Sequence, residues 1–154
     1  MSIRVPVKYR FDASLDRVLE AYQQKMLSRS HERTKGVSVR VRETSPSQST
    51  YAVTRSMPTW YRLLGGNDST QYVETLKLED GKMITSASQN LPFGGKAETR
   101  IVFVPDGTST VVIGTVTASQ LPNRVQRIAQ RVFKSYVEKT FAEERKVESK
   151  LILA

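Results

Sequence analysis

The chain has 154 residues, no cysteine, one histidine and a formal net charge of +9. Without cysteine it can form no disulfide, cysteine-ligated zinc site or thiol nucleophile, and one histidine excludes a histidine-rich metal site, so we expect no metal. Residues 1–42 hold ten Lys and Arg against four Asp and Glu. This excess favours an acidic partner, either an anionic lipid surface, a nucleic acid or an acidic protein, unless the charge serves solubility alone.

A chain of this length is expected to form one domain, residues 1–154, with a core of its own. No segment approaches the roughly 18–20 apolar residues that a membrane-spanning helix needs. The N-terminus lacks the apolar segment that is typical of a secretory signal. These features predict a soluble, intracellular protein.

Apolar and polar residues alternate over residues 3–11, which predicts a strand with one buried face. Pro6 cannot donate to a β-ladder, so this strand should lie at a sheet edge or contain a bulge. A helix should follow, capped by Asp12 or Ser14. Its apolar face is predicted to contain Leu15, Val18, Leu19, Tyr22 and Met26. Residues 28–35 are polar and predict a loop, in which the only histidine, His31, should be solvated.

Alternating patterns predict further strands at residues 36–43, 50–56, 70–79, 82–91, 97–104 and 108–118. Asp-Gly dipeptides at residues 80–81 and 106–107 separate consecutive strands and are typical of tight hairpin turns. Successive hairpins predict an antiparallel sheet. Residues 57–66 break the β pattern and predict a short helix that ends at Gly65 and Gly66.

The longest predicted element is a helix over residues 121–152, where apolar residues recur every three or four positions. Pro122 suits its first turn, because a proline there loses no intrahelical hydrogen bond. At ~1.5 Å per residue such a helix would be roughly 45 Å long, so it needs a broad partner surface. The sheet is the expected partner, and a coiled-coil seam with a second copy is the alternative.

These elements predict an α+β fold of the helix-grip type, the architecture of START-like domains. A curved antiparallel sheet of about six to seven strands would wrap around the long C-terminal helix. A short N-terminal helix would close one end, and residues 57–66 would form a small lid helix.

Two segments carry a closer resemblance to PRELI-like domains. The middle of that family resembles residues 57–66, MPTWYRLLGG, and residues 72–93, YVETLKLEDGKMITSASQNLPF. Its final helix resembles residues 131–151, RVFKSYVEKTFAEERKVESKL. The chain departs from the family at residues 23–35, where a Tyr-Pro-Asn-Pro type segment is usual and this sequence begins QQKMLSRSHE. A group of bacterial START-like proteins of unknown function fits the short loops equally well.

The PRELI-like resemblance implies transfer of a phospholipid, typically phosphatidic acid or phosphatidylserine, between mitochondrial membranes. It therefore implies a location in the intermembrane space and a small helical partner protein. Lys134 and Lys139 border the apolar stripe and match lysines of the family's final helix, so they are predicted to pair with a lipid phosphate. Phe133 and Tyr136 of the stripe would line the pocket.

Other basic residues are candidates for contact with the same anion. Arg40 and Arg55 lie on predicted strands, and a buried arginine would need an anion such as a phosphate; alternation alone leaves their direction open. A further set follows one side of the final helix near its N-terminus, where cations oppose the helix dipole. This indicates contact with an anionic surface or a solvated face, and the set comprises Arg124, Arg127 and Arg131.

The predicted lid contains Trp60, Tyr61, Leu63 and Leu64, beside two glycines that could act as hinges. Exposed aromatic and aliphatic side chains there could enter a membrane interface and open the pocket. In the alternative interpretation, Trp60 plugs one end of the core.

The predicted function is non-enzymatic binding, and intermembrane transfer, of an anionic phospholipid or similar hydrophobic ligand. The sequence contains no Ser-His-Asp set, Gly-rich phosphate loop or metal-ligand spacing, and no enzyme and no cofactor is expected. An enzyme that uses the pocket is the least favoured alternative, because START-like pockets occasionally host lyases or cyclases. The carboxylate pairs Asp12/Asp16 and Glu143/Glu144 are interpreted as solvated helix residues. The alternative is an interaction subunit that docks on a large complex, an RNA or an anionic membrane. Nucleic acid is less favoured, because no exposed aromatic platform is evident.

Overall fold

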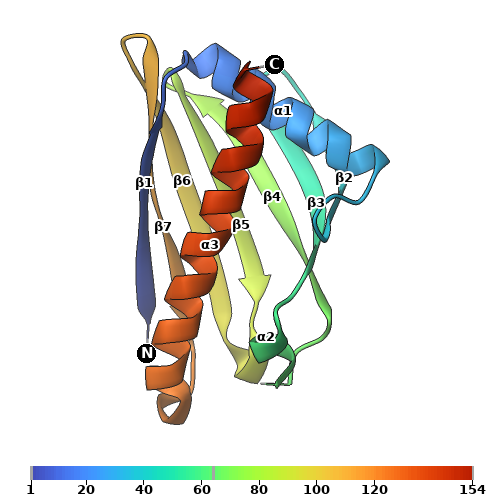
Figure 1. The fold of residues 1–154 in the computed structure, drawn as a ribbon, viewed down its shortest axis with the longest axis vertical. Helices are drawn as coiled ribbons and strands as arrows, with labels where there is room; N and C mark the ends of the chain where they lie inside the picture. Colours follow the sequence, from blue (N-terminus) through green and yellow to red (C-terminus); the bar gives the residue numbers. More distant parts are fainter. Residues whose placement is uncertain (1, 64, 154) are drawn as a thin grey trace.

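The computed structural model describes residues 2–63 and 65–153 (Figure 1). The elements follow one another in the order β1 Ile3–Phe11, α1 Leu15–His31, β2 Val37–Thr44, β3 Gln48–Ser56, α2 Thr59–Leu63, β4 Ser69–Glu79, β5 Lys82–Asn90, β6 Lys96–Asp106, β7 Ser109–Ser119 and α3 Gln126–Leu153. Short 3-10 turns lie at Pro92–Gly94 and Asn123–Val125. The predicted sequence of strands and helices is therefore confirmed in order and type.

The strands form one seven-stranded antiparallel sheet in the order β1-β7-β6-β5-β4-β3-β2. From β2 to β7 each strand pairs with the next in the chain, and only β1 joins a strand from the far end of the sequence. β1 is an edge strand, as Pro6 predicts. The β4–β5 turn has positive φ at both Asp80 and Gly81, as a tight two-residue hairpin requires.

The helices lie on one side of the sheet (Figure 1). α3 runs along the sheet, α1 crosses its upper end and α2 lies near the opposite end. Buried side chains of β1, β3, β6, β7, α1 and α3 belong to one core cluster, which includes Val5, Val18, Val53, Phe103, Val112 and Phe133. This is the helix-grip architecture predicted from the sequence. No helix in the described part of the chain is long and apolar enough to cross a membrane.

Two helix boundaries and one packing position differ from expectation. α1 is capped by the Ser14 hydroxyl, which accepts from the Arg17 N–H at 3.4 Å, and it continues to His31 rather than ending before residue 28. Its last turns are helical because Lys25 and Arg29 are buried against α3. The regular α-helix of α3 begins at Gln126 rather than near residue 121. Ile128, placed on the apolar stripe of α3, is 66% exposed, whereas the next residue, Ala129, is buried in the core, so the buried side of this turn runs through Ala129.

Gly114 on β7 marks a close approach between strands. A Cβ at this position would lie 2.3 Å from the Arg100 carbonyl oxygen and 2.8 Å from the Ile101 Cα, both on β6. We expect Gly114→Ala to lower the free energy of unfolding by about 1–3 kcal/mol, because the backbone must move to accept the methyl group. Urea denaturation followed by circular dichroism measures the change. Thr117→Ala, on the same strand, is the control and should change stability little.

Candidate ligand-binding cavity

A cavity of about 110 Å³ lies between the sheet and α3. Its walls come from all three helices and from every strand except β2. Most of the wall is apolar or aromatic, and its central part contains Met57, Leu91, Ile101, Phe103, Val116 and Phe133. The charged side chains of the wall gather toward one end.

The end near α2 is aromatic. Trp60 from α2 packs edge-on against Tyr136 of α3, with ring centroids 5.9 Å apart, and against Tyr61 at 6.0 Å. The Tyr61 hydroxyl donates to the Asn90 carbonyl at 3.2 Å, and the Tyr136 hydroxyl lies 3.7 Å from the Met57 Sδ. These contacts hold the short helix α2 against the end of the cavity.

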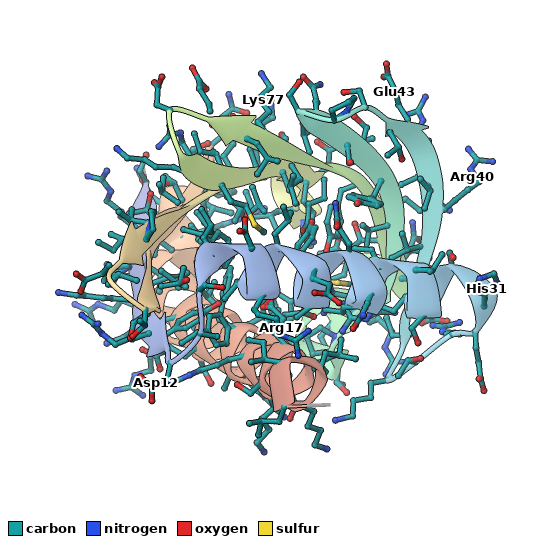
Figure 2. All side chains as sticks on the ribbon, turned by 90° about the horizontal axis from the view of Figure 1, so that it is seen from above. Asp12, Arg17, His31, Arg40, Glu43 and Lys77 are labelled. Carbon is teal, nitrogen blue, oxygen red and sulfur yellow. The ribbon has the colours of Figure 1, made fainter. Side chains whose placement is uncertain are left out.

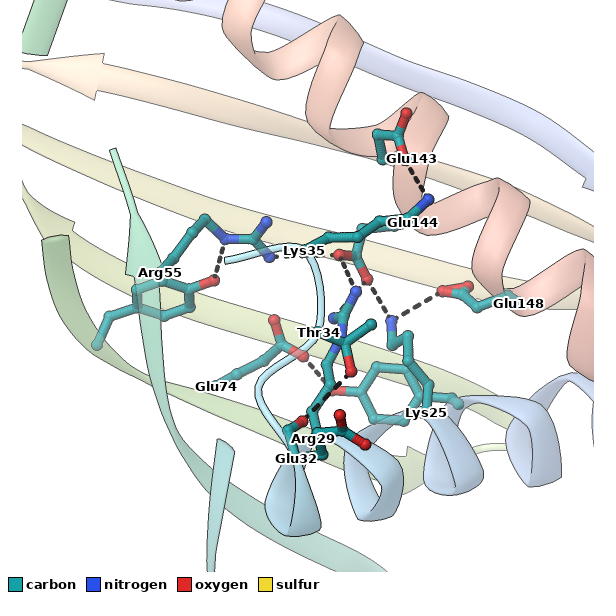
Figure 3. Close-up of polar contacts among 12 residues, drawn as sticks. Lys25, Arg29, Glu32, Thr34, Lys35, Arg55, Glu74, Glu143, Glu144 and Glu148 are labelled. Atoms are coloured by element: carbon teal, nitrogen blue, oxygen red, sulfur yellow. Dashed lines mark hydrogen bonds and ion pairs between the residues drawn. The ribbon is translucent and has the colours of Figure 1, made fainter. Parts of the chain in front are cut away.

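The opposite end is ionic and is centred on Glu144 of α3 (Figure 3). The Glu144 carboxylate accepts from Lys25 Nζ at 2.6 Å, from both terminal nitrogens of Arg29 at 3.1 and 3.0 Å, and from Arg55 Nη2 at 3.3 Å. Lys25 and Arg29 come from α1, and Arg55 comes from β3. One carboxylate thus joins three elements that are far apart in the sequence.

Glu148, one turn further along α3, completes this cluster. Its Oε1 accepts from Lys25 Nζ at 3.2 Å, while its Oε2 is buried without a hydrogen-bond partner among the described residues. The side chain of Lys25 is only 4% exposed. A lysine this deeply buried needs its charge matched, and it has two carboxylates to do so.

The two carboxyl groups titrate in opposite directions. Burial disfavours the charge of Glu144, but the attraction of Lys25, Arg29 and Arg55 outweighs burial and holds the pKa of Glu144 well below its usual range. For Glu148, burial dominates and the neighbouring Glu144 adds to it, so its pKa is raised despite the attraction of Lys25. Burial lowers the pKa of Lys25, yet Glu144 and Glu148 together raise it, so this lysine stays charged.

Tyrosine hydroxyls extend the network toward the sheet. The Tyr22 hydroxyl donates to Glu74, and Arg55 Nε donates to the Tyr72 hydroxyl at 3.2 Å. Burial raises the pKa of Tyr72 to about 12, although Arg55 opposes that shift. Burial also raises the pKa of Tyr22, and Glu74 adds to this shift. Both phenols therefore remain protonated at neutral pH.

The structure brings four of the predicted ligand-contact and lid residues to the cavity wall. These are Arg55, Trp60, Phe133 and Tyr136. Arg55 faces inward, as a phosphate contact would require, but the anion that it meets is Glu144 of the same chain. Trp60 lies in the wall and is half-buried. It is therefore less exposed than a membrane-contacting lid residue would be, and less buried than a residue that plugs the core.

The other predicted phosphate contacts lie outside the cavity. Arg40 is exposed and points away from the sheet (Figure 2). Lys134 and Lys139 lie on the exposed side of α3, where Lys134 Nζ is 4.0 Å from Glu138. Each lysine lies one or two positions from a buried residue, Phe133 or Val137, and one residue along a helix turns the side chain by ~100°. Their position beside the apolar stripe therefore directs them away from the cavity.

The remaining predicted lid and surface residues are partly buried and partly exposed. Tyr61 is buried, Leu63 is 81% exposed, and Leu64 lies outside the described residues. The basic set is exposed, as a surface contact requires: Arg124 in the 3-10 turn before α3, and Arg127 and Arg131 in the first half of α3.

Sequence reasoning missed the ionic cluster. The interpretation of Glu144 as a solvated residue like Glu143 is wrong, because Glu143 pairs with Lys35 near the surface whereas Glu144 is buried. The sequence does contain a pattern that indicates this cluster: Glu144 and Glu148 continue the helical spacing of the buried positions of α3. On α1, the residues in phase with Val18 and Tyr22 are likewise charged, but of opposite sign: Lys25 and Arg29.

No protein-family model matches this sequence, and no curated protein matches it significantly. Solved structures match over nearly the whole chain. The protein TTHA0849 from Thermus thermophilus has a TM-score of 0.65 at 16% identity, with 97% of each chain covered. Norcoclaurine synthase from Thalictrum flavum has a TM-score of 0.64 at 15% identity, and the match covers 99% of this chain and 87% of the other. The Zhui aromatase/cyclase of Streptomyces sp. R1128 has a TM-score of 0.59 at 9% identity, and the match covers 99% of this chain and 92% of the other.

These matches define the class of the fold, which is the helix-grip fold of Bet v1-like and START-like proteins. They also correct one prediction. Two of the three proteins are enzymes by name, a synthase and an aromatase/cyclase. The conclusion that the chain is not an enzyme is therefore wrong, because the absence of familiar catalytic motifs does not separate the binding proteins of this fold from its enzymes.

Removing the central carboxylate tests the ionic cluster. We expect Glu144→Gln to lower the free energy of unfolding by about 3–5 kcal/mol, because three cations lose their shared buried partner. Chemical denaturation measures the loss. Glu143→Gln, one position away at the surface, is the matched control and should leave stability unchanged. Equal stability of the two variants would contradict the proposed importance of the cluster.

The same variant should change the dependence of stability on pH. The pKa of Glu144 is lower in the folded protein than its ordinary value of 4.5, so its contribution is complete above that value and is lost as the pH falls below it. The stability difference between the wild type and Glu144→Gln should be constant near neutral pH and shrink below about pH 4.5. Urea denaturation over a pH series measures this, and a difference that grows on acidification would refute it.

Proposed function

We propose that this protein binds a small, mostly apolar ligand in the cavity between the sheet and α3. The observation that carries the proposal is an apolar cavity with a buried ionic cluster at one end. Burial of apolar surface would provide the affinity, at about 25 cal/mol per Å². The few polar groups at the inner end would fix the orientation of the ligand, as in ligand sites generally.

The size of the cavity bears on the size of the ligand. An engineered apolar cavity of about 150 Å³ in another protein admits benzene, whereas sites for drug-sized ligands measure roughly 300–1,000 Å³. The present cavity of 110 Å³ is smaller than that benzene site, so it fits a molecule of at most about one ring. Transfer of a phospholipid, the finer hypothesis from the PRELI-like resemblance, needs a several-fold larger space and a large displacement of α2, so it is the less favoured hypothesis.

The α2 end is the proposed entrance. Trp60 and Tyr136 close the cavity there, and α2 is a helix of five residues beside Gly65, which has positive φ. Leu63 and Ile128 expose apolar side chains at this end of the molecule. With the exposed Arg127 and Arg131, they support the proposal that this end meets an anionic membrane surface.

Acid–base chemistry on the bound molecule is a second candidate function. A specific observation favours it: the inner end of the cavity holds a buried carboxyl with a raised pKa, Glu148, in contact with a buried Lys25. Carboxyl groups whose pKa is raised by burial are suited to proton transfer. Under this proposal, the chain would bind its ligand as described and then move a proton on it.

Filling the cavity should abolish binding. Val116 lies in the wall, so Val116→Phe should occupy the space and weaken binding at least about tenfold, the effect expected when a ring-sized site is lost. Ile113→Phe places the same ring on the exposed face of the same strand and is the control. Trp60 is the only tryptophan and lines the cavity, so its fluorescence reports binding of a small aromatic probe such as toluene.

Native mass spectrometry of the purified chain, with extraction of any bound molecule, complements this titration. A small co-purifying organic molecule that Val116→Phe lacks would support the proposal. Phospholipid bound in equal amounts to the protein would instead support the lipid-transfer hypothesis. Unchanged Trp60 fluorescence with every probe, and a clean protein mass, would refute ligand binding in this cavity.

A further inference from the structure

The ionic cluster leaves one acceptor without a partner at the inner end of the cavity. Glu148 is 3% exposed and lines the cavity, its Oε1 is bonded to Lys25, and its Oε2 has no hydrogen-bond partner among the described residues. Buried polar atoms are nearly always hydrogen-bonded, and an orphaned one in a native protein needs an explanation. A ligand that donates a hydrogen bond to Oε2 would supply it.

The cations of the cavity are already committed to protein groups. Lys25 contacts Glu144 and Glu148, Arg29 contacts both oxygens of Glu144, and Arg55 contacts Glu144 and Tyr72. An anionic head group would have to compete for these cations beside the carboxylates that hold them. The cavity wall contains as many carboxylates as cations, namely Glu74, Glu144 and Glu148. The cluster thus offers no uncommitted positive charge for a phosphate or carboxylate ligand.

A cationic ligand is disfavoured for a different reason. Lys25 Nζ lies 3.2 Å from Oε1 of the same carboxyl group that the ligand would contact. A second cation at Oε2 would stand within a few ångströms of this ammonium group, and like charges repel strongly where water is excluded. A neutral O–H donor satisfies Oε2 without changing the charge of the cluster. Burial opposes the ionised form of Glu148, but the ammonium group of Lys25 on Oε1 favours it, and hydrogen bonds from hydroxyls to carboxylates are short and strong.

We propose that the cavity selects a compact neutral molecule, about one aromatic or alicyclic ring in size, whose hydroxyl group donates a hydrogen bond to Glu148 Oε2. This inference rests on the proposed ligand-binding function and adds the chemical class of the ligand. Among the described residues, the groups that act on Glu148 from other elements are Lys25 and Tyr22 of α1, Glu74 of β4 and Tyr9 of β1, together with Glu144 on α3 itself. Burial and then Glu148 raise the pKa of Tyr9, so this neighbour also stays neutral.

Four ring-sized probes separate the possible chemistries. Phenol donates a hydrogen bond, toluene has nearly the same size and does not, anisole only accepts, and phenyl phosphate is an anion. Isothermal titration calorimetry on the full chain should show phenol binding about tenfold or more tighter than toluene, the effect of a hydrogen bond to a charged group. Anisole should bind no better than toluene, and phenyl phosphate should bind more weakly than phenol.

Two variants test whether Glu148 causes the preference for phenol over toluene. In Glu148→Gln, the side-chain oxygen still accepts from Lys25 and the amide N–H₂ faces the cavity, so the preference for phenol over toluene should fall below about threefold and anisole should gain. Glu143→Gln is the matched control and should keep the wild-type preference. If Glu148→Gln folds poorly, the double variant Lys25→Met, Glu148→Leu removes the acceptor together with its cation; it should bind toluene and phenol equally.

The outcomes distinguish the inference from the function on which it rests. Toluene binding without any advantage for phenol would overturn the hydroxyl inference, leave the cavity as a ligand site, and imply that a buried water satisfies Oε2. A phenol preference that survives in Glu148→Gln would also overturn it, as would tightest binding of phenyl phosphate. If neither toluene nor phenol binds the wild type, the proposed function itself fails.

Discussion

The charge of Glu144 is the constraint on which the rest of the structure depends. A carboxylate removed from water must be matched, and it is matched by cations from α1 and β3 that must themselves be matched once buried. The three elements can therefore bury this region only together. This requirement fixes α1 across the end of the sheet, seals one end of the cavity with charged groups, and leaves its other end to the aromatic contacts of Trp60 and Tyr136.

The cavity consequently changes in polarity along its length. Tyr136 and Glu148 are about 18 Å apart along α3, at ~1.5 Å per residue, and the wall passes from aromatic rings to buried charges between them. Because the charges cancel within the protein, the ionic end is polar without being attractive to ions. A molecule that enters is oriented by single hydrogen bonds rather than by net charge. Such a site is suited to a neutral amphiphilic ring, whether the protein only binds it or also transfers a proton.

Most of the fold could be predicted, because alternation and helical spacing are local signals; the strand order follows from the hairpins, and Pro6 indicates the edge. The residues of the site were harder to predict from the sequence. Phe133 and Tyr136 follow from the apolar stripe. Lys134 and Lys139, which were predicted to meet a lipid phosphate, lie on the exposed side of α3, because one residue along a helix turns the side chain by ~100°. Glu144 was missed because a charged residue on a helix is usually solvated. Its burial depends on the complementary charges of α1, more than a hundred residues earlier, which no local pattern connects to it.

The pairing of β1 with β7 has a consequence for synthesis of the chain. β1 and α1 are synthesised well before their partners, β7 and α3, because β2 to β6 lie between them in the chain. Until then both edges of β1 are unpaired and Lys25 lacks the carboxylates of Glu144 and Glu148, so β1 and α1 cannot reach their final packing. Contacts of such long sequence separation fold slowly and leave apolar surface exposed in the meantime. The Arg and Lys side chains that alternate with the apolar residues of β1 keep this strand soluble before it pairs with β7, and they discourage its pairing with other chains.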